Sequence, residues 1–434
     1  MNRRRAGLVV GLLALLAAAP AWAQSPAVSR ARLANGLTVL VRENPTAPVV
    51  GVSLMVRMGT RWETADNAGI SNLVQLMVVR GTTTRNGGQI VEAADGMGGS
   101  IEATGDVDYS EVAATALSRH WVELLELVAD VTLRPTFPDG VVGAVRDFLL
   151  RQVRNRGEKP YDTALDTLTA RLFGRHPYAW DPIGLNDSLE RLDRAALLAH
   201  YQRHYVPGGL VLAVSGRVKT AEVLAQASRL FGAMPAGAAP VPAPPSPPAP
   251  APWRETRVIP GAQAQILVGA LAPALTDPEY PAVKVLASVL GGGMAGRFFA
   301  ELRDKQGLAY TTAAQYPARV DNSYFLAQLG TAPENVARAE AALRAQLERA
   351  QREPVPGEEL RVAKAYLLGN LAMDRRTNAR QAWYLAAYEQ SGVGYEFLER
   401  YVAAVRAVTA ADVQRVARRY VGVLRTVIVQ PTPP

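Results

Sequence analysis

The chain has 434 residues, of which 49% are hydrophobic and 20% charged, a composition typical of a globular protein large enough for two or three domains. Its 47 basic and 39 acidic residues give a net charge of +8, but the basic residues form no block after positions 3–5, so the charge does not indicate nucleic-acid binding. The absence of cysteine excludes disulfides, thiolate metal sites and cysteine nucleophiles.

The N-terminus has the pattern of a secretory signal peptide. Three arginines at 3–5 precede an apolar run over 6–19 and the small-residue motif 21–23, which predicts cleavage after Ala23. The apolar run has 14 residues, fewer than the roughly 20 that a helix needs to cross a bilayer. We therefore expect residues 1–23 to be removed, and we expect the mature protein to be exported to the periplasm without a membrane span.

Two comparable halves follow this segment. Each ends with a helix and a β-branched strand, over 193–216 and 409–431, with Asp193 and Thr409 as predicted N-caps. Each half also begins with strands, "GLTVLVRENP" and "VVGVSLMVRMG" in the first, "RETRVIPG" and "QAQILVGAL" in the second. The pattern indicates an internal duplication. It predicts an α+β fold with a mainly antiparallel sheet covered by helices in each half.

A proline-rich segment separates the halves. Half of the residues in 235–252 are proline, which favours an extended polyproline II spacer. The predicted domains are therefore 24–235 and 253–434, joined by a linker over 236–252. At about 3.1 Å per residue the spacer would reach roughly 50 Å, so the halves need not lie side by side.

Within the first half, the segment "AGISNLVQLMVVRGT" (68–82) predicts an amphipathic helix. Its apolar residues recur at helical spacing, and we expect Ile70, Leu73, Leu76 and Met77 to form its core-facing side.

This helix and three further segments resemble the insulinase/pitrilysin family of zinc metallopeptidases, which carry the motif H-x-x-E-H. The resemblance covers nearly the whole mature chain, including 32–64, "GGSIEAT" at 98–104 and "GGGMAGRFFAELRDKQGLAY" at 291–310. It implies a duplicated α+β fold whose two halves close on a peptide. It also implies a zinc site on the helix, completed by a more distal Glu.

In this chain the zinc positions hold other residues. Asn72 and Leu76 stand where the resemblance implies the two His ligands, Gln75 where it implies the general base, and Gln152 best matches the distal Glu. An amide is a poor zinc ligand and leucine is none, and glutamine cannot accept a proton from water at neutral pH. We therefore expect no metal and no cofactor in this chain, and no hydrolysis by it alone.

The four histidines offer no clear replacement. His200 and His204 are four residues apart, which is a zinc-site spacing, but no Glu stands between them and the matching helix of the second half has no His. Two histidines on a half-buried helix are the preferred interpretation. His120 and His176 are predicted at loop or helix-edge positions without a carboxylate partner.

The second half keeps a different feature. The resemblance implies an Arg and a Tyr seven residues apart that face the zinc and hold the substrate backbone and the developing oxyanion, and Arg303 and Tyr310 have this spacing. Both side chains are suitable donors to a negatively charged oxygen. The alternative is that Arg303 is a solvated helix residue and Tyr310 a buried strand residue.

The strand after the helix is expected to bind peptide. The resemblance implies that its exposed edge takes the substrate as an added strand, with Glu102 where many members have Asn. The predicted edge residues are Gly99, Ser100, Ile101, Glu102 and Ala103.

Three hypotheses remain open. In the first, the chain is the zinc-less subunit of an exported peptidase, and a zinc-bearing homologue is its partner in cleaving peptides. In the second, the chain is a non-enzymatic peptide-binding or scaffold protein with the same fold. The third, a self-sufficient protease with an unrecognised site, ranks last.

Overall fold

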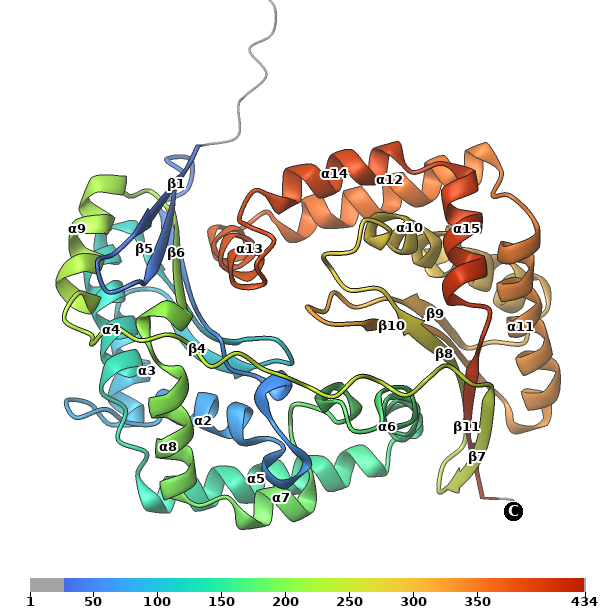
Figure 1. Ribbon diagram of the computed structural model, residues 1–434, viewed down its shortest axis with the longest axis horizontal. Coiled ribbons are helices and arrows are strands. Elements are labelled where there is room, and N and C mark those ends of the chain that lie inside the picture. Colours follow the sequence, from blue (N-terminus) through green and yellow to red (C-terminus); the bar gives the residue numbers. More distant parts are fainter. Residues whose placement is uncertain (1–26, 433–434) are drawn as a thin grey trace, which may run out of the picture.

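The computed structural model describes residues 27–432, and Figure 1 shows two halves joined by a segment that crosses from one to the other. The predicted signal peptide, 1–23, lies outside the described residues. None of the helices in the described chain is long and apolar enough to cross a membrane.

The first half contains a six-stranded sheet in the order β1-β2-β6-β3-β5-β4. Only β2 and β6 pair in parallel, and the other neighbours are antiparallel. The strands are β1 (Val28–Arg32), β2 (Thr38–Glu43), β3 (Val49–Val56), β4 (Ser100–Gly105), β5 (Ser110–Leu117) and β6 (Leu210–Gly216). The helices are α2 (Ile70–Val78), α3 (Gly87–Gly96), α4 (Trp121–Leu133), α5 (Asp139–Gly157), α6 (Pro160–Phe173), α7 (Asn186–Arg191), α8 (Arg194–His204) and α9 (Thr220–Phe231).

The second half contains a five-stranded sheet in the order β7-β11-β8-β10-β9, in which only β7 and β11 are parallel. The strands are β7 (Trp253–Ile259), β8 (Ala264–Ala272), β9 (Thr311–Gln315), β10 (Ser323–Thr331) and β11 (Arg425–Pro431). The helices are α10 (Tyr280–Gly291), a π-helical segment (Phe298–Lys305), α11 (Val336–Arg352), α12 (Gly357–Asp374), α13 (Asn378–Gln390), α14 (Phe397–Ala407) and α15 (Ala410–Tyr420).

The two sheets share one topology. The order β2-β6-β3-β5-β4 matches β7-β11-β8-β10-β9, with the parallel pair in the same place, and β1 is an addition to the first sheet. Both predicted N-caps are also confirmed: the Asp193 side chain accepts from the Ala196 N–H, and the Thr409 side chain accepts from the Asp412 N–H. The α+β class and the mainly antiparallel sheets are as the sequence predicts.

Each half sends one helix onto the sheet of the other. Helix α6 lies against β8 and β11, and α13 lies against β3 and β6. Figure 1 shows α6 reaching towards the second half and α13 towards the first. Leu168 and Phe173 of α6 are buried with Val427 of the second sheet, and Ala382 of α13 is buried with Met55 of the first. Both faces of each sheet are therefore covered, which explains why β3 and β8 are apolar along nearly their whole length.

Polar contacts also join the two halves. Arg61 donates two hydrogen bonds to the Asp321 carboxylate, at 2.6 and 2.8 Å, and His176 Nε2 lies 3.5 Å from the same carboxylate. The Tyr178 hydroxyl donates to Asp108, which also accepts from the Val320 N–H at 3.1 Å. The halves are therefore packed together, and the expectation that they need not lie side by side is wrong.

The linker has no helix or strand, as predicted, but it follows the protein surface. The Trp62 indole N–H donates to the Pro240 carbonyl at 2.8 Å, and the Gly208 N–H donates to the Gly237 carbonyl at 2.9 Å. Near its end, Arg425 donates to the Ala249 carbonyl at 3.0 Å. These contacts hold the linker against both halves, so it does not act as a free spacer.

Candidate functional site

Helix α2 begins on a buried carboxylate. Its N-cap, Gly69, has a left-handed φ of 93° and no side chain with which to cap the helix. The Glu63 carboxylate takes this role and accepts from the N–H groups of Gly69 and Ser71, each at 2.9 Å. Burial raises the pKa of Glu63 despite these hydrogen bonds. The two hydrogen bonds satisfy N–H groups that have no partner within the helix, and they fix where α2 starts.

Gln75, at the predicted general-base position, is fully buried and has a structural role. Its amide N–H donates to the Glu111 carbonyl of β5 at 2.6 Å, and its amide oxygen accepts from the Tyr205 hydroxyl at 2.7 Å. The amide supplies both the donor and the acceptor that these two partners need, whereas an ionised carboxylate would supply acceptors only. The side chain therefore ties α2 to the sheet and to the end of α8.

The other predicted zinc positions lie on neighbouring elements. Asn72 is half-buried beside β4, where Gly105 approaches so closely that an added Cβ would lie 2.7 Å from the Asn72 Cα. Leu76 is half-buried against the first-half core, whereas Ile70, Leu73 and Met77 are fully part of it. Gln152 is half-buried on α5, which packs against α2.

These side chains do not fit zinc. The set offers two amides and one aliphatic group, where a zinc site needs imidazole, carboxylate or thiolate ligands. The amide of Gln75 is occupied by Glu111 and Tyr205. Within residues 27–432, no group of three or more His, Asp or Glu side chains is arranged to hold a metal ion.

The His200 and His204 pair is buried and packs inside the first half. The two rings lie 4.4 Å apart; His200 Nε2 is 3.1 Å from the Ser71 hydroxyl, and His204 Nδ1 is 2.7 Å from the Arg57 carbonyl. Burial lowers the pKa of His200 to about 3 and that of His204 to about 4. Both rings are therefore neutral at physiological pH, and they hold α8 against α2 and the end of β3.

The expectation that His120 and His176 lack carboxylate partners is wrong. His120, the residue before α4, lies 3.7 Å from Glu123 in the first turn of that helix, and buried His176 lies 3.5 Å from Asp321. Asp321 belongs to the other half, so no local pattern around His176 reports it.

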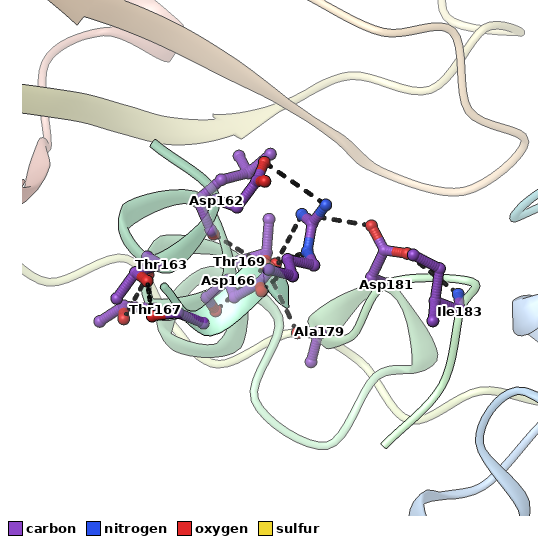
Figure 2. Close-up of polar contacts among 11 residues, drawn as sticks. Asp162, Thr163, Asp166, Thr167, Thr169, Ala179, Asp181 and Ile183 are labelled. Atoms are coloured by element: carbon purple, nitrogen blue, oxygen red, sulfur yellow. Dashed lines mark hydrogen bonds and ion pairs between the residues drawn. The ribbon is translucent and has the colours of Figure 1, made fainter. Parts of the chain in front are cut away.

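The C-terminal end of α5, the helix that carries Gln152, is held by a group of three aspartates. Arg156 contacts Asp166 at 2.8 Å, Asp181 at 3.2 Å and Asp162 at 3.5 Å. Figure 2 shows the three carboxylates converging on one guanidinium. Burial opposes the charge of Arg156, but the hydrogen bonds that it donates to Asp166 and the neighbouring negative charges raise its pKa. The group fixes α5 to α6, which crosses to the second half.

The predicted peptide-binding edge is β4 with the residue before it. Strand β4 pairs with β5, and in the described chain no other strand pairs with its outer edge. Ser100 and Glu102 are exposed, Gly99 and Ile101 are half-buried, and Ala103 is buried. An edge of this kind can accept an extended peptide as an added strand.

Arg303 and Tyr310 are both exposed. Arg303 lies in the π-helical segment with its guanidinium 5.0 Å from the Phe299 ring centroid. Tyr310 precedes β9, and its side chain is 55% exposed although its N–H donates to the Gly330 carbonyl at 2.8 Å. The alternative is thus wrong for Tyr310, which is not buried, but Arg303 is a solvated residue of a helical segment, as the alternative expected. Among residues 27–432, no hydrogen bond or ion pair joins either side chain to α2.

Three residues that shape α2 were not singled out from the sequence, namely Glu63, Glu111 and Tyr205. Glu63 carries a signal, because an acidic residue shortly before a predicted helix with no N-cap side chain is a candidate cap. Glu111 and Tyr205 contribute through tertiary contacts, the first with its backbone carbonyl. Nothing in their local sequence indicates these contacts.

Two protein-family models match the chain. The model described as Insulinase (Peptidase family M16) matches residues 38–181, and the model described as Peptidase M16 inactive domain matches residues 191–367. The first match includes α2 and the second includes Arg303 and Tyr310.

Known proteins resemble the chain over most of its length. A protein of Mycobacterium bovis described as an uncharacterized zinc protease is 28% identical over 92% of this chain and 91% of its own length. A Rickettsia felis protein of the same description is 25% identical over 86% of this chain and 88% of its own length. Among solved structures, a peptidase M16 inactive domain from Pseudomonas fluorescens has a TM-score of 0.87 at 24% identity, covering 94% of this chain and 98% of its own. A Helicobacter pylori protease has a TM-score of 0.88 at 21% identity, covering 94% and 100%. At these identities the two structures establish the fold alone.

Proposed function

Because the chain belongs to the insulinase family, peptidase family M16, we propose that it is the zinc-less subunit of an exported two-chain peptidase. A zinc-bearing homologue would supply the H-x-x-E-H helix, and this chain would supply Arg303 and Tyr310. The proposal includes export, through the predicted signal peptide, to the periplasm.

The observation that carries the proposal is the exposure of the Arg303 and Tyr310 side chains. An exposed guanidinium and an exposed phenol are free to donate hydrogen bonds to a partner or a substrate. Both groups suit the charge that develops on a scissile carbonyl oxygen, the guanidinium as a charged donor and the phenol as a neutral one. Neither side chain is part of the hydrophobic core of the second half.

A second candidate is a peptide-binding protein without chemistry. It is favoured by β4, whose outer edge is unpaired in residues 27–432 although the neighbouring helix offers no zinc ligands. Strand addition depends on backbone hydrogen bonds and needs no catalytic group.

Co-expression with an H-x-x-E-H homologue from the same organism distinguishes these functions. The proposal predicts a stable complex that cleaves unstructured peptides that neither chain cleaves alone, with zinc bound in the partner. The isolated mature chain, dialysed against trace zinc, should retain no stoichiometric zinc. One tightly held zinc per isolated chain, or a verified complex without gained activity, would contradict the proposal.

A further inference from the structure

A cavity of about 250 Å³ lies where the two halves meet, on the side of α13 that bears Tyr384 and Tyr388. Residues of both halves line it. Arg42 of β2 comes from the first half, and Arg375 and Gln381 come from the segment between α12 and α13 and from α13 itself. The α2 residues, Arg303 and Tyr310 are not among its lining residues, so it is separate from the candidate site.

The two arginines have no carboxylate partner. Along β2, Arg42 is on the same face as Leu40, which packs against α13, so Arg42 is on the side that meets the second half. Within residues 27–432 neither Arg42 nor Arg375 forms an ion pair. The sequence of residues 1–26 contains no Asp or Glu that would supply one.

Arg375 also has an unused donor. Its terminal Nη2 donates to the Gln381 side chain at 3.3 Å, but its Nε is buried and finds no hydrogen-bond partner in the described chain. Leaving a buried charged donor unsatisfied is costly. Because this atom has almost no solvent-accessible surface, a ligand in the cavity would reach other atoms of Arg375.

The charges point to the same kind of ligand. Burial and then the nearby charge of Arg375 lower the pKa of Arg42. Burial also lowers the pKa of Arg375, although Tyr384, Tyr388 and the charge of Glu399 act in the opposite direction. Two like charges in a partly buried site favour an anion between them. Glu396 and Glu399 also line the cavity, but both are exposed and neither forms an ion pair with Arg42 or Arg375 in the described chain.

We propose that this cavity binds a small oxyanion, a carboxylate or a phosphate, between Arg42 and Arg375. Guanidinium groups offer paired N–H donors that match the oxygens of either group. Tyr388, half-buried in the wall, adds a neutral donor to the lining of the cavity. Because the arginines come from different halves, the bound anion would stabilise the contact between the halves.

The test uses the mature chain, residues 24–434, with inorganic phosphate, sulfate and acetate as separate probes at constant ionic strength, and with chloride as the reference salt. Binding is measured by calorimetry and by the shift in Tm. We expect saturable binding of at least one oxyanion, and a Kd at least tenfold weaker in Arg42→Gln and in Arg375→Gln. Arg361→Gln is the matched control, because Arg361 is exposed and already paired with Glu358.

A second readout separates a ligand site from a structural role. Without an oxyanion, Arg42→Gln should unfold at or above the wild-type Tm, because the substitution removes a like-charge repulsion. Tyr388→Phe, which keeps both charges and the aromatic ring, should still weaken binding. Comparing phosphate with acetate then identifies which oxyanion the cavity prefers. The proposal is overturned if none of the three probes saturates, or if all the variants respond to them as the wild type does.

Discussion

Gln75 stands where the resemblance predicts the general base, and its surroundings match an amide. Its N–H satisfies the buried Glu111 carbonyl, and its oxygen accepts from the Tyr205 hydroxyl. Gln75 therefore has a structural role, and an ionised carboxylate could not take it because it has no donor for the Glu111 carbonyl.

We predict that Gln75→Glu lowers the free energy of unfolding by about 1 to 3 kcal/mol at pH 7. The substitution leaves the Glu111 carbonyl without its donor and places a carboxylate beside it in a buried site. Urea denaturation measures the change. Gln202→Glu, the same substitution at an exposed position of α8, should change stability little. Equal stability of the two variants would show that Gln75 has no such role.

At this scale the sequence identified the positions but not their roles. The family resemblance, and not the residues alone, assigns the zinc positions to Asn72, Gln75 and Leu76, and the side chains at those positions are unsuited to zinc. The structural role of Gln75 depends on Glu111, 36 residues away, and on Tyr205, 130 residues away. Hydrogen bonds over such separations leave no periodic pattern in the sequence.

Among the elements, α13 depends on the absence of a side chain in β3. A Cβ added to Gly51 would lie 2.4 Å from the Ala379 backbone of α13. Real contacts are never this short, so the helix would have to move away from the first sheet.

We predict that Gly51→Ala destabilises the protein by about 3 kcal/mol, the upper part of the range for overpacked sites. Gly143→Ala makes the same substitution in α5 at a position with open space around it. Because alanine favours helices over glycine, it should stabilise by about 0.5 to 1 kcal/mol. Thermal and urea denaturation of both variants test the pair. Equal effects at the two sites would contradict the close packing of α13 on β3.

The type of an element could be predicted where the residues that determine it lie within that element or next to it in the sequence. The amphipathic helix predicted over 68–82 is α2, Ile70–Val78, and both predicted N-caps, Asp193 and Thr409, cap their helices. The crossing of α6 and α13 was not predicted. Apolar spacing shows that a helix face is buried, but it does not show which sheet buries it.

At the scale of the whole molecule, Asp321 joins the halves through Arg61 and His176. Burial alone would raise the pKa of Asp321, but the hydrogen bonds from His176 and Arg61 outweigh burial and lower it. A carboxyl with a lowered pKa stabilises the fold above its unfolded pKa of about 3.9, and this contribution disappears as the pH falls through the folded value.

We therefore predict that Asp321→Asn lowers the free energy of unfolding by about 2 kcal/mol at pH 7, the magnitude of a hydrogen bond to a charged group. The difference from wild type should shrink towards pH 3. Thermal denaturation across this range measures it. Asp66→Asn is the control, because the Asp66 side chain is 96% exposed and its contact with Arg191 is 3.9 Å long. If the difference in stability between wild type and Asp321→Asn stayed constant with pH, it could not come from the ionised Asp321 carboxylate.

The central claim is that this chain completes the active site of a partner, and the most direct measurement is the kcat of the reconstituted two-chain complex. If Arg303 and Tyr310 stabilise the developing oxyanion, Arg303→Ala or Tyr310→Phe should lower kcat by roughly 10²- to 10³-fold. Assembly and zinc content should stay unchanged, and Asp304→Ala, at an exposed neighbouring position, should have little effect. Full activity of both variants in a verified complex would contradict the claim and favour a peptide-binding or scaffold role.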